Sequence, residues 1–378
     1  MPEESIIQLI NQWAPILIFH PDEGSQCCYP SNAEIAYDKI IHNNFSKDKS
    51  PTTLNQTAPC YYNCVSYKIN NIDIIRIKYW FWYNYNDFPS GPDPYGSHEG
   101  DWESVEVILF SKRLFAVLYS NHETYLTTWR NEFRMENKRL MVYVGNGSHA
   151  NYPLLQTPLF HYDFWNMEFY DQIADSNDRW DTRNNLRDIN TTKFRYFVGY
   201  WGNHIIHALS YEGRPPLSPM VRENEYNIPF YRIVTYTGDV DDATSDANVF
   251  INLINNNTKN SVGPFELDNY ENNFQRAHVD VFASTDYPRS QIPFFPFIPT
   301  LQTGNIFPIW NNKYIDNITQ IRLWHDNSGR YPGWFVDKIE IYDMVKRQRC
   351  GFNCHKWLAE DEGGIDFTFN RSGGYSRF

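Results

Sequence analysis

The sequence predicts a mainly β protein built as two β-sandwich domains in series. Short runs of alternating apolar and polar residues follow one another from about Ile69 onward. These runs are rich in β-branched and aromatic residues and are separated by Gly, Pro, Asn or Ser, as in antiparallel sandwiches and barrels. A proline-rich, charged break at residues 213–229 predicts a linker. We therefore expect one domain over residues 1–220 and a second over residues 229–372.

The individual elements follow from the period of the apolar pattern. Helical spacing is confined to three stretches, residues 3–12, 34–41 and 164–173. Strands are predicted wherever alternation is bounded by turn residues. In the first domain these runs are IDIIRIKYWFWY (72–83), DWESVEVILF (101–110), RLFAVLYS (113–120) and RLMVYVG (139–145). In the second they are YRIVTYTG (231–238), ANVFINLI (247–254), AHVDVFA (277–283), ITQIRLWHD (318–326), WFVDKIEIYD (334–343) and IDFTFN (365–370).

The overall composition limits the classes of function. With 378 residues, 42% of them hydrophobic and 17% aromatic, the chain can bury a full core. A net charge of −12 and no basic run argue against a nucleic-acid partner. The start, MPEESIIQLINQW, lacks the basic and apolar regions of a signal peptide, and no apolar run reaches membrane-spanning length. We expect a soluble protein, peripheral at membranes, that is cytoplasmic or exported by a non-classical route.

The cysteines form three local pairs. Structural zinc usually has a tighter spacing than C-x3-C, and the pairs lie far apart in the sequence, so buried or free thiols are favoured over disulfides or zinc. The six residues are Cys27, Cys28, Cys60, Cys64, Cys350 and Cys354.

The stretch GSHEGDWESVEVIL (96–109) concentrates charge at the start of a predicted strand. Residues two apart share a face of a strand, so Glu99, Asp101 and Glu103 project together. They repel one another unless a cation, an arginine or protonation compensates, and a divalent ion is the simplest hypothesis. With the imidazole of His98, they suit Mg²⁺, Ca²⁺ or Mn²⁺ better than a thiolate-preferring ion. The alternative is a solvated, salt-bridged strand end.

Two family resemblances bear on this domain. WAPILIFHPDE (13–23), YWFWYNYN (79–86), HEGDWESVEVIL (98–109) and VYVGNGSHANYP (142–153) resemble the vacuolar protein sorting-associated sixty-two family. The DWE core is similar to that of the necrosis-inducing cytolysins, whose heptad holds a divalent metal.

The cytolysin resemblance implies residue roles for this chain. His98, Asp101 and Glu103 take the metal-ligand positions, and Gly100 stands where that heptad has a second histidine. His122 in YSNHE and His149 in GSHAN match recurrent histidines of both families, and either could instead be structural.

Four motifs of the second domain resemble the PLAT family, also called the lipoxygenase-homology β-sandwich. They are TGDVDDATSDANVFINL (237–253), FQRAHVDVF (274–282), IRLWHDNSGRYPGWFVDKIEIYD (321–343) and FNCHKWLAEDEGG (352–364). The resemblance implies an eight-stranded sandwich that docks onto membrane lipid headgroups or a protein partner, often with calcium. Carboxylates crowd its loops and suit a hard cation, although they could simply cap turns. The candidate ligands are Asp239, Asp241, Asp246 and Asp326.

A long insertion departs from the PLAT pattern between residues 282 and 318. It contains QIPFFPFIPTLQTGNIFPIW, whose prolines forbid a helix or a central strand. The loop either docks against the other domain or inserts aromatic side chains at a bilayer interface. The candidate membrane contacts are Phe294, Phe295, Phe297, Phe307 and Trp310.

The sequence leaves three classes of function open. In the first, slightly favoured, the metal activates water for lipid hydrolysis of a phospholipase or phosphodiesterase type, with Glu99, His122 or His149 as acid or base. In the second, a non-enzymatic cytolysin or trafficking effector recognises lipid or glycan headgroups through the metal. In the third, the chain is a scaffold that joins proteins at a membrane. The absence of G-x-S-x-G argues against an α/β-hydrolase.

Overall fold

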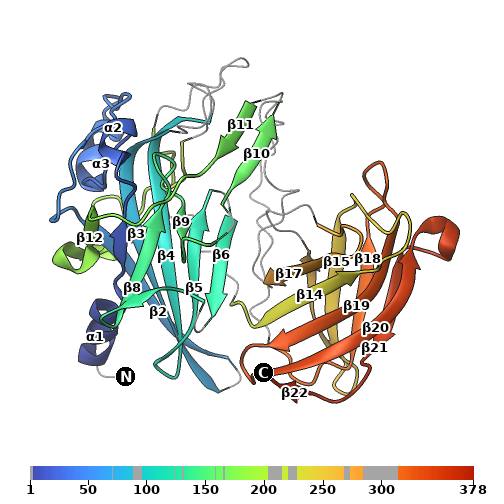
Figure 1. Ribbon diagram of the computed structural model, residues 1–378. Helices are drawn as coiled ribbons and strands as arrows, with labels where there is room; N and C mark the ends of the chain where they lie inside the picture. The colour runs from blue at the N-terminus through green and yellow to red at the C-terminus, as the bar shows by residue number, and fades with distance from the viewer. Residues whose placement is uncertain are drawn as a thin grey trace. The chain divides into compact units, whose positions relative to one another are not determined.

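The fold consists of two compact units, each built mainly of strands as the sequence predicts (Figure 1). The computed structural model describes residues 3–69, 71–87, 96–122, 124–129, 132–157, 159–164, 167–202, 215–219, 228–267, 273–283 and 314–378. Of these, the residues up to Pro219 belong to the first unit and those from Ile228 onward belong to the second. No helix within the described ranges is both long and apolar enough to cross a bilayer.

The first unit contains two larger sheets and a separate hairpin. One sheet has the order β13-β2-β3-β4-β5-β6, and the other has the order β12-β1-β8-β7 with β9 also paired to β8. The strands of the first sheet are β2 (Cys60–Ile69), β3 (Ile72–Asn86), β4 (His98–Phe110), β5 (Arg113–Asn121), β6 (Thr124–Trp129) and β13 (Leu186–Asp188). Those of the second are β1 (Ile16–Ile18), β7 (Met135–Glu136), β8 (Arg139–Val144), β9 (Asn151–Tyr152) and β12 (Arg179–Asp181). The hairpin pairs β10 (His161–Phe164) with β11 (Met167–Tyr170), and the helices are α1 (Glu3–Trp13), α2 (Glu23–Gln26), α3 (Ala33–Ile41), η1 (Thr182–Asn185) and η2 (Ile189–Thr191).

An apolar core lies between the two larger sheets. Odd-numbered side chains of β3 and β4, such as Tyr83 and Val105, pack there with Leu17 of β1 and Val142 of β8. Successive side chains of a strand point to opposite faces, so a second cluster occupies the other side of the large sheet. It contains Trp80, Trp82, Trp102, Phe194 and Trp201, together with Ala33 and Ala36 of α3. The same parity places Asp101 and Glu103 on the inner face.

The second unit is a sandwich of two antiparallel sheets. Their orders are β17-β14-β19-β20-β22 and β16-β15-β18-β21. The first comprises β14 (Tyr231–Thr237), β17 (Val279–Ala283), β19 (Trp334–Asp343), β20 (Gln348–Leu358) and β22 (Ser376–Arg377). The second comprises β15 (Val249–Asn255), β16 (Asn260–Glu266), β18 (Gln320–His325) and β21 (Asp366–Asn370), and η5 (Glu360–Glu362) follows β20. Apart from the two-residue β22, the described residues of this unit form the eight strands that the family resemblance implies.

One predicted helix is wrong. Residues 164–173 have apolar residues at helical spacing, but the structure places β10 and β11 there, with Tyr162 opposite Phe169 and Asp163 opposite Glu168. Pairing between neighbouring strands therefore overrides the local pattern. The other two predicted helices are confirmed as α1 and α3, and all ten predicted strands are present. The longer strands β2, β6, β16 and β20 were not predicted from the sequence.

Candidate functional site

The imidazole of His149 lies at the centre of a buried polar cluster in the first unit. His149 follows β8 in a tight loop, with a backbone φ of 57°, and its side chain is fully buried. Its Nδ1 lies 2.9 Å from Oδ2 of Asp101 on β4, and its Nε2 lies 3.2 Å from Oε1 of Glu23 on α2. The ring stacks on Tyr83 of β3 at a centroid distance of 3.8 Å. Two sheets and a helix therefore meet at this side chain.

The electrostatics of the cluster follow from its two carboxylates. Burial alone would lower the pKa of the His149 imidazole, but hydrogen bonds with Asp101, the Cys28 side chain and Glu23 outweigh it and raise that pKa well above its usual range. The cluster therefore holds a buried imidazolium between two acidic groups. Oε2 of Glu23 also accepts a hydrogen bond from the backbone N–H of Gly147 at 3.0 Å, which ties α2 to the His149 loop.

Asp101 and Glu103 lie side by side on the inner face of β4, as the alternation predicts. They are only 5% and 4% exposed, so a solvated strand end is wrong for these two carboxylates. Glu103 accepts hydrogen bonds from the Ser120 hydroxyl and, at 3.3 Å, from Nδ2 of Asn151. Asp101 thus pairs with His149, and Glu103 links β4 to β5 and β9 through hydrogen bonds.

His98 and Glu99 lie at the start of the same strand, next to Gly100. Nδ1 of His98 is 2.7 Å from the carbonyl oxygen of Gly100, and burial lowers the pKa of its imidazole although the charge of Asp101 opposes that change. The backbone and Cβ of Glu99 pack against Gly202. His98 occupies an even position of β4, whereas Asp101 and Glu103 occupy odd positions. The side chains of these three predicted ligands do not form a metal-ligating group in the described part of the chain, and their metal stays a prediction.

The local structure requires glycine at position 100. Its φ is 66°, a left-handed conformation that favours glycine, and a Cβ built there would lie 2.0 Å from the carbonyl oxygen of Trp201 and 2.5 Å from the Trp82 ring. The tryptophan cluster occupies the space in which a side chain at position 100 would have to lie.

His122 belongs to a second polar cluster. It follows β5 with a φ of 57°, its side chain is 18% exposed, and its Nε2 lies 2.9 Å from Oδ2 of the buried Asp171. Asp171 also accepts hydrogen bonds from the hydroxyls of Ser148, at 2.5 Å, and Tyr152. Burial would raise the pKa of this carboxyl, but these partners lower it below its usual value. The arrangement orients a part-exposed imidazole with a buried carboxylate.

We predict that Asp171 contributes an acid-sensitive part of the stability. A carboxyl whose pKa is lowered on folding stabilises the fold above its unfolded pKa, about 3.9, and this contribution is lost as the pH falls through the lower folded pKa. Asp171→Asn should cost about 1–3 kcal/mol near neutral pH and should flatten the loss of unfolding free energy below about pH 4. Urea unfolding across this range measures both effects.

The control for this prediction is Asp38→Asn. Asp38 lies on α3, is 47% exposed at its side chain and pairs with Lys193. Its substitution should leave the acid dependence as in the wild type. An unchanged acid slope in Asp171→Asn would contradict the role of Asp171.

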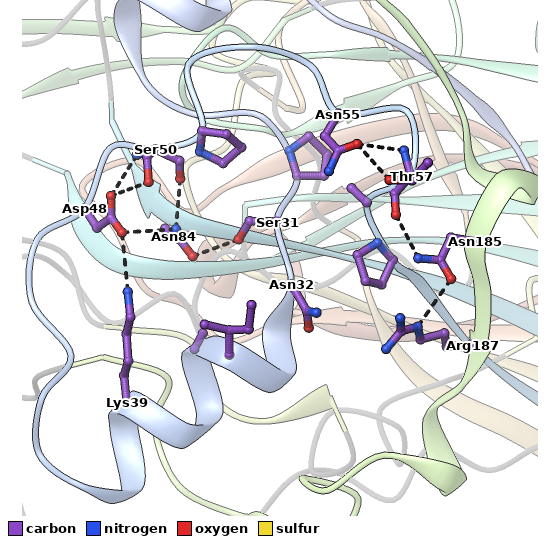
Figure 2. Close-up of a pocket in the computed structure, with 16 residues that line it drawn as sticks. Ser31, Asn32, Lys39, Asp48, Ser50, Asn55, Thr57, Asn84, Asn185 and Arg187 are labelled. Atoms are coloured by element: carbon purple, nitrogen blue, oxygen red, sulfur yellow. Dashed lines mark hydrogen bonds and ion pairs between the residues drawn. The ribbon is translucent and has the colours of Figure 1, made fainter.

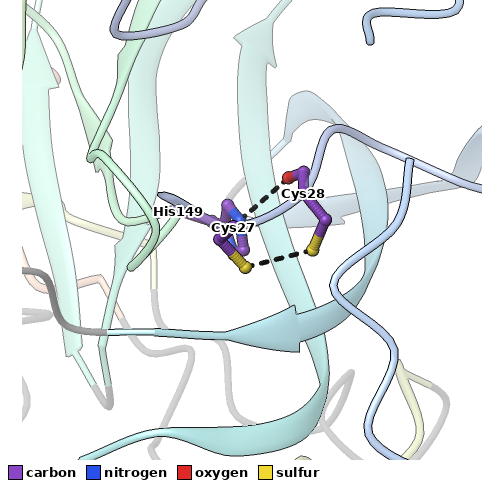
Figure 3. A group of neighbouring side chains, drawn as sticks. All are labelled: Cys27, Cys28 and His149. Atoms are coloured by element: carbon purple, nitrogen blue, oxygen red, sulfur yellow. Dashed lines mark hydrogen bonds between the residues drawn. The ribbon is translucent and has the colours of Figure 1, made fainter. Parts of the chain in front are cut away.

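Three further residues of the His149 cluster were not predicted as site residues from the sequence. Cys27 and Cys28 follow α2 and lie beside His149 (Figure 3). Their Sγ atoms are 3.2 Å apart, and each is 3.2 Å from the carbonyl oxygen of Tyr85. Burial raises the pKa of Cys27 well above its usual value. Burial also acts to raise the pKa of Cys28, but hydrogen bonds with Cys27 and His149 lower it to about 7. In the sequence, the adjacent cysteines are the one feature that could have indicated that Cys27 and Cys28 belong to a site. No sequence feature indicated Glu23. All six cysteines are free thiols, as favoured from the sequence.

A pocket of about 490 Å³ lies beside α3 (Figure 2). Asn84 of β3 organises one wall: its Oδ1 accepts hydrogen bonds from Ser31 Oγ at 2.8 Å and Trp82 Nε1 at 2.9 Å. Asn185 donates to the carbonyl oxygen of Thr57 at 2.8 Å on the opposite wall. Amides, hydroxyls and charged groups share the lining with Ile35 and several prolines, so the pocket offers a ligand both polar and apolar contacts.

In the second unit, three loops meet at one end, which we call the acidic loop end: residues 238–246, 274–278 and 326–332. The backbone N–H of Ala277 donates to Gly238 O at 3.3 Å, and that of Asp246 donates to Tyr331 O at 3.2 Å. Tyr331 is 65% exposed.

The predicted calcium ligands divide into two kinds at this end. Asp246 accepts backbone hydrogen bonds from Arg330 and Tyr331, and Asp326 accepts one from Ser328, as turn-capping carboxylates do. Asp239 and Asp241 are exposed and form ion pairs with Arg276. Nε of Arg276 lies 2.8 Å from Oδ1 of Asp239, and its Nη1 lies 2.6 Å from Oδ1 of Asp241. Whether they bind calcium stays a prediction. The aromatic candidates Phe294, Phe295, Phe297, Phe307 and Trp310 lie outside the described residues.

Comparison with known proteins defines the class of the second unit. Residues 231–370 match the PLAT/LH2 domain family, so the C-terminal part of this chain contains a PLAT/LH2 domain. The chain is 31% identical over 171 residues to lipoxygenase homology domain-containing protein 1 of Mus musculus, a match that covers 44% of this chain and 7% of that protein. It is 30% identical over 149 residues to polycystin-1-like protein 3 of Homo sapiens, covering 39% and 7%. A solved coral 8R-lipoxygenase is 19% identical with a TM-score of 0.27, covering 37% of this chain and 16% of that one. The chain thus spans less than a tenth of the length of these two curated relatives.

Proposed function

We propose that this chain is a peripheral membrane protein in which the PLAT/LH2 domain attaches to lipid headgroups and the first unit recognises the headgroup of a target lipid. The observation that carries the proposal is the match of residues 231–370 to the PLAT/LH2 family. The acidic loop end supports it, because exposed Tyr331 and part-exposed Val240 lie there beside carboxylates that suit calcium. Docking to a protein partner through the same domain is the competing outcome.

Recognition is favoured over hydrolysis in the first unit by the burial of His149, one of the three predicted acid or base groups. His149 is fully buried and contacts an acidic group through each ring nitrogen, so it does not face a substrate. The pocket beside α3 offers room for a headgroup, and its amides and hydroxyls can hydrogen-bond hydroxyls of that headgroup. A hard cation at His98, Asp101 and Glu103, Mg²⁺, Ca²⁺ or Mn²⁺, enters the proposal only as a structural ion, because Asp101 and Glu103 are buried.

Metal-dependent lipid hydrolysis is the second candidate, and His122 favours it. This imidazole is part-exposed and is oriented by the buried carboxylate of Asp171, which is the layout of a general base. Mass spectrometry of mixed-lipid vesicles incubated with the full chain and divalent cations distinguishes the candidates. Recognition alone leaves every lipid class intact. Loss of one class, abolished by His122→Gln and retained by His161→Gln on β10, would overturn recognition in favour of hydrolysis.

We predict that calcium strengthens vesicle binding through Asp239 and Asp241. In the described structure, these two carboxylates form side-chain ion pairs with Arg276 and no other hydrogen bond or ion pair. The double change to Asn should therefore remove the calcium dependence of binding. It should change the melting temperature no more than ordinary surface substitutions do. Sedimentation with vesicles in calcium and in chelator measures the effect. Asp366→Asn, at an exposed carboxylate that pairs with Arg322 on β18, is the matched control. Retained calcium dependence in the double variant would exclude these ligands.

A further inference from the structure

Three metal-ligating side chains converge in the first unit from distant parts of the chain. Cys27 and Cys28 follow α2, and His149 lies in the loop between β8 and β9 (Figure 3). One ligand atom of each lies within 4.8 Å of the other two, and all three residues are buried. They differ from the predicted hard-cation ligands in both identity and chemistry.

The donor set selects a class of ion. Thiolate sulfur and imidazole nitrogen together suit zinc and other thiolate-preferring cations, whereas magnesium and calcium take oxygen ligands. Asp101 contacts Nδ1 of His149, which leaves Nε2 on the side of Cys28 and Glu23. A carboxylate on the remote ring nitrogen is the usual support for a metal-binding histidine. A cation bound at Nε2 would take the place of the proton there.

Glu23 supplies a fourth donor. Its side chain is fully buried, and its Oε1 accepts no hydrogen bond of regular geometry in the described part of the chain. The distance of 3.2 Å between this oxygen and Nε2 of His149 is close to the edge of a zinc tetrahedron with N and O ligands, about 3.3 Å from bond lengths near 2.0–2.1 Å. The two Sγ atoms, 3.2 Å apart, must separate to about 3.8 Å, the edge for zinc–sulfur bonds near 2.3 Å.

We propose that Cys27, Cys28 and His149, completed by Glu23, form a buried structural site for a thiolate-preferring divalent cation such as Zn²⁺. The ion would join the segment after α2 to the loop between β8 and β9. It would also balance the negative charge that the thiolates and Glu23 place inside the unit, which is costly to bury uncompensated. This site is separate from any ion at His98, Asp101 and Glu103, and Asp101 supports it only through His149.

The test uses Co²⁺ as the probe, in full-length protein expressed in cobalt-supplemented medium. Native mass spectrometry should show a bound cobalt, and the near-ultraviolet spectrum should show thiolate-to-cobalt charge transfer. Cys28→Ser or Cys27→Ser should lower that absorbance by about half, because one of two thiolate ligands is lost. Cys60→Ser, at a fully buried thiol outside the site, should retain all of it. Absent charge transfer in folded wild type, or equal absorbance in Cys28→Ser, would overturn the proposal.

A second measurement covers the case in which the cysteine variants fold poorly. The melting temperature of wild type and of Cys60→Ser should rise with added Zn²⁺, because an ion that binds only the folded state stabilises it. Glu23→Gln keeps both thiols and should show a smaller rise. No rise in the wild type after treatment with chelator and reductant would overturn the site.

Discussion

Replacing Asp101 by alanine is expected to produce one of the largest losses of stability in the first unit. The change leaves the His149 imidazolium buried beside Tyr83 with one of its two acidic partners removed. Breaking a buried ion pair from one side costs about 3–5 kcal/mol, because the remaining charge is left uncompensated. Urea unfolding followed by tryptophan fluorescence gives the change in unfolding free energy.

Two variants control this measurement. Asp101→Asn keeps an oxygen that can accept from Nδ1 of His149, so its loss should be smaller. Asp73→Ala changes an exposed carboxylate of β3 that pairs with Lys68, and should stay within about 0.5 kcal/mol of wild type. If Asp101→Ala cost no more than Asp73→Ala, Asp101 would not hold His149 in the folded chain.

Replacing Gly100 by histidine is expected to disrupt the strand end. Gly100→His places a side chain where a Cβ alone would lie 2.0 Å from Trp201 O. Left-handed backbone costs about 1–2 kcal/mol for most residues, and overpacking a filled site adds about 1–3 kcal/mol. Near-ultraviolet circular dichroism of the tryptophan cluster and urea unfolding should both report the loss.

Gly100→Ala separates the two causes of that loss. Alanine carries the backbone and Cβ penalties without the ring, so it should lie between wild type and Gly100→His in unfolding free energy. Gly351→Ala is the control, because a Cβ at that glycine meets no atom within 4 Å. Wild-type stability in Gly100→His would mean that the departure from the cytolysin heptad has no steric cause.

The alternation of apolar and polar residues predicted much of the fold, because in these strands alternate side chains enter the core. β3 and β4 were predicted from runs whose odd positions enter the core, and Tyr83 indeed lies opposite Asp101 in the register. The hairpin of β10 and β11 was predicted as a helix, since the pairing of Tyr162 with Phe169 is a property of two segments and not of one. β2, which lies between β13 and β3, was not predicted from the sequence.

The candidate site shows the same limit more strongly. Alternation placed Asp101 and Glu103 on one face, and the structure agrees. The groups that contact His149 come from far along the chain: Asp101 is 48 residues away and Cys28 is 121 residues away. Spacing in a single sequence does not encode such contacts, so the convergence of Glu23, Cys27 and Cys28 on His149 required the tertiary structure.

Vesicle sedimentation of the full chain tests membrane attachment most directly. Wild type and Tyr331→Ser are compared on phosphatidylcholine vesicles with and without phosphatidylserine, each in calcium and in chelator. Tyr196→Ser is the control, because Tyr196 is a tyrosine of the first unit that is 79% exposed. We expect binding by wild type and Tyr196→Ser, and about tenfold weaker binding by Tyr331→Ser, equivalent to about 1.4 kcal/mol. Wild-type protein that stays in the supernatant under every condition would contradict membrane attachment.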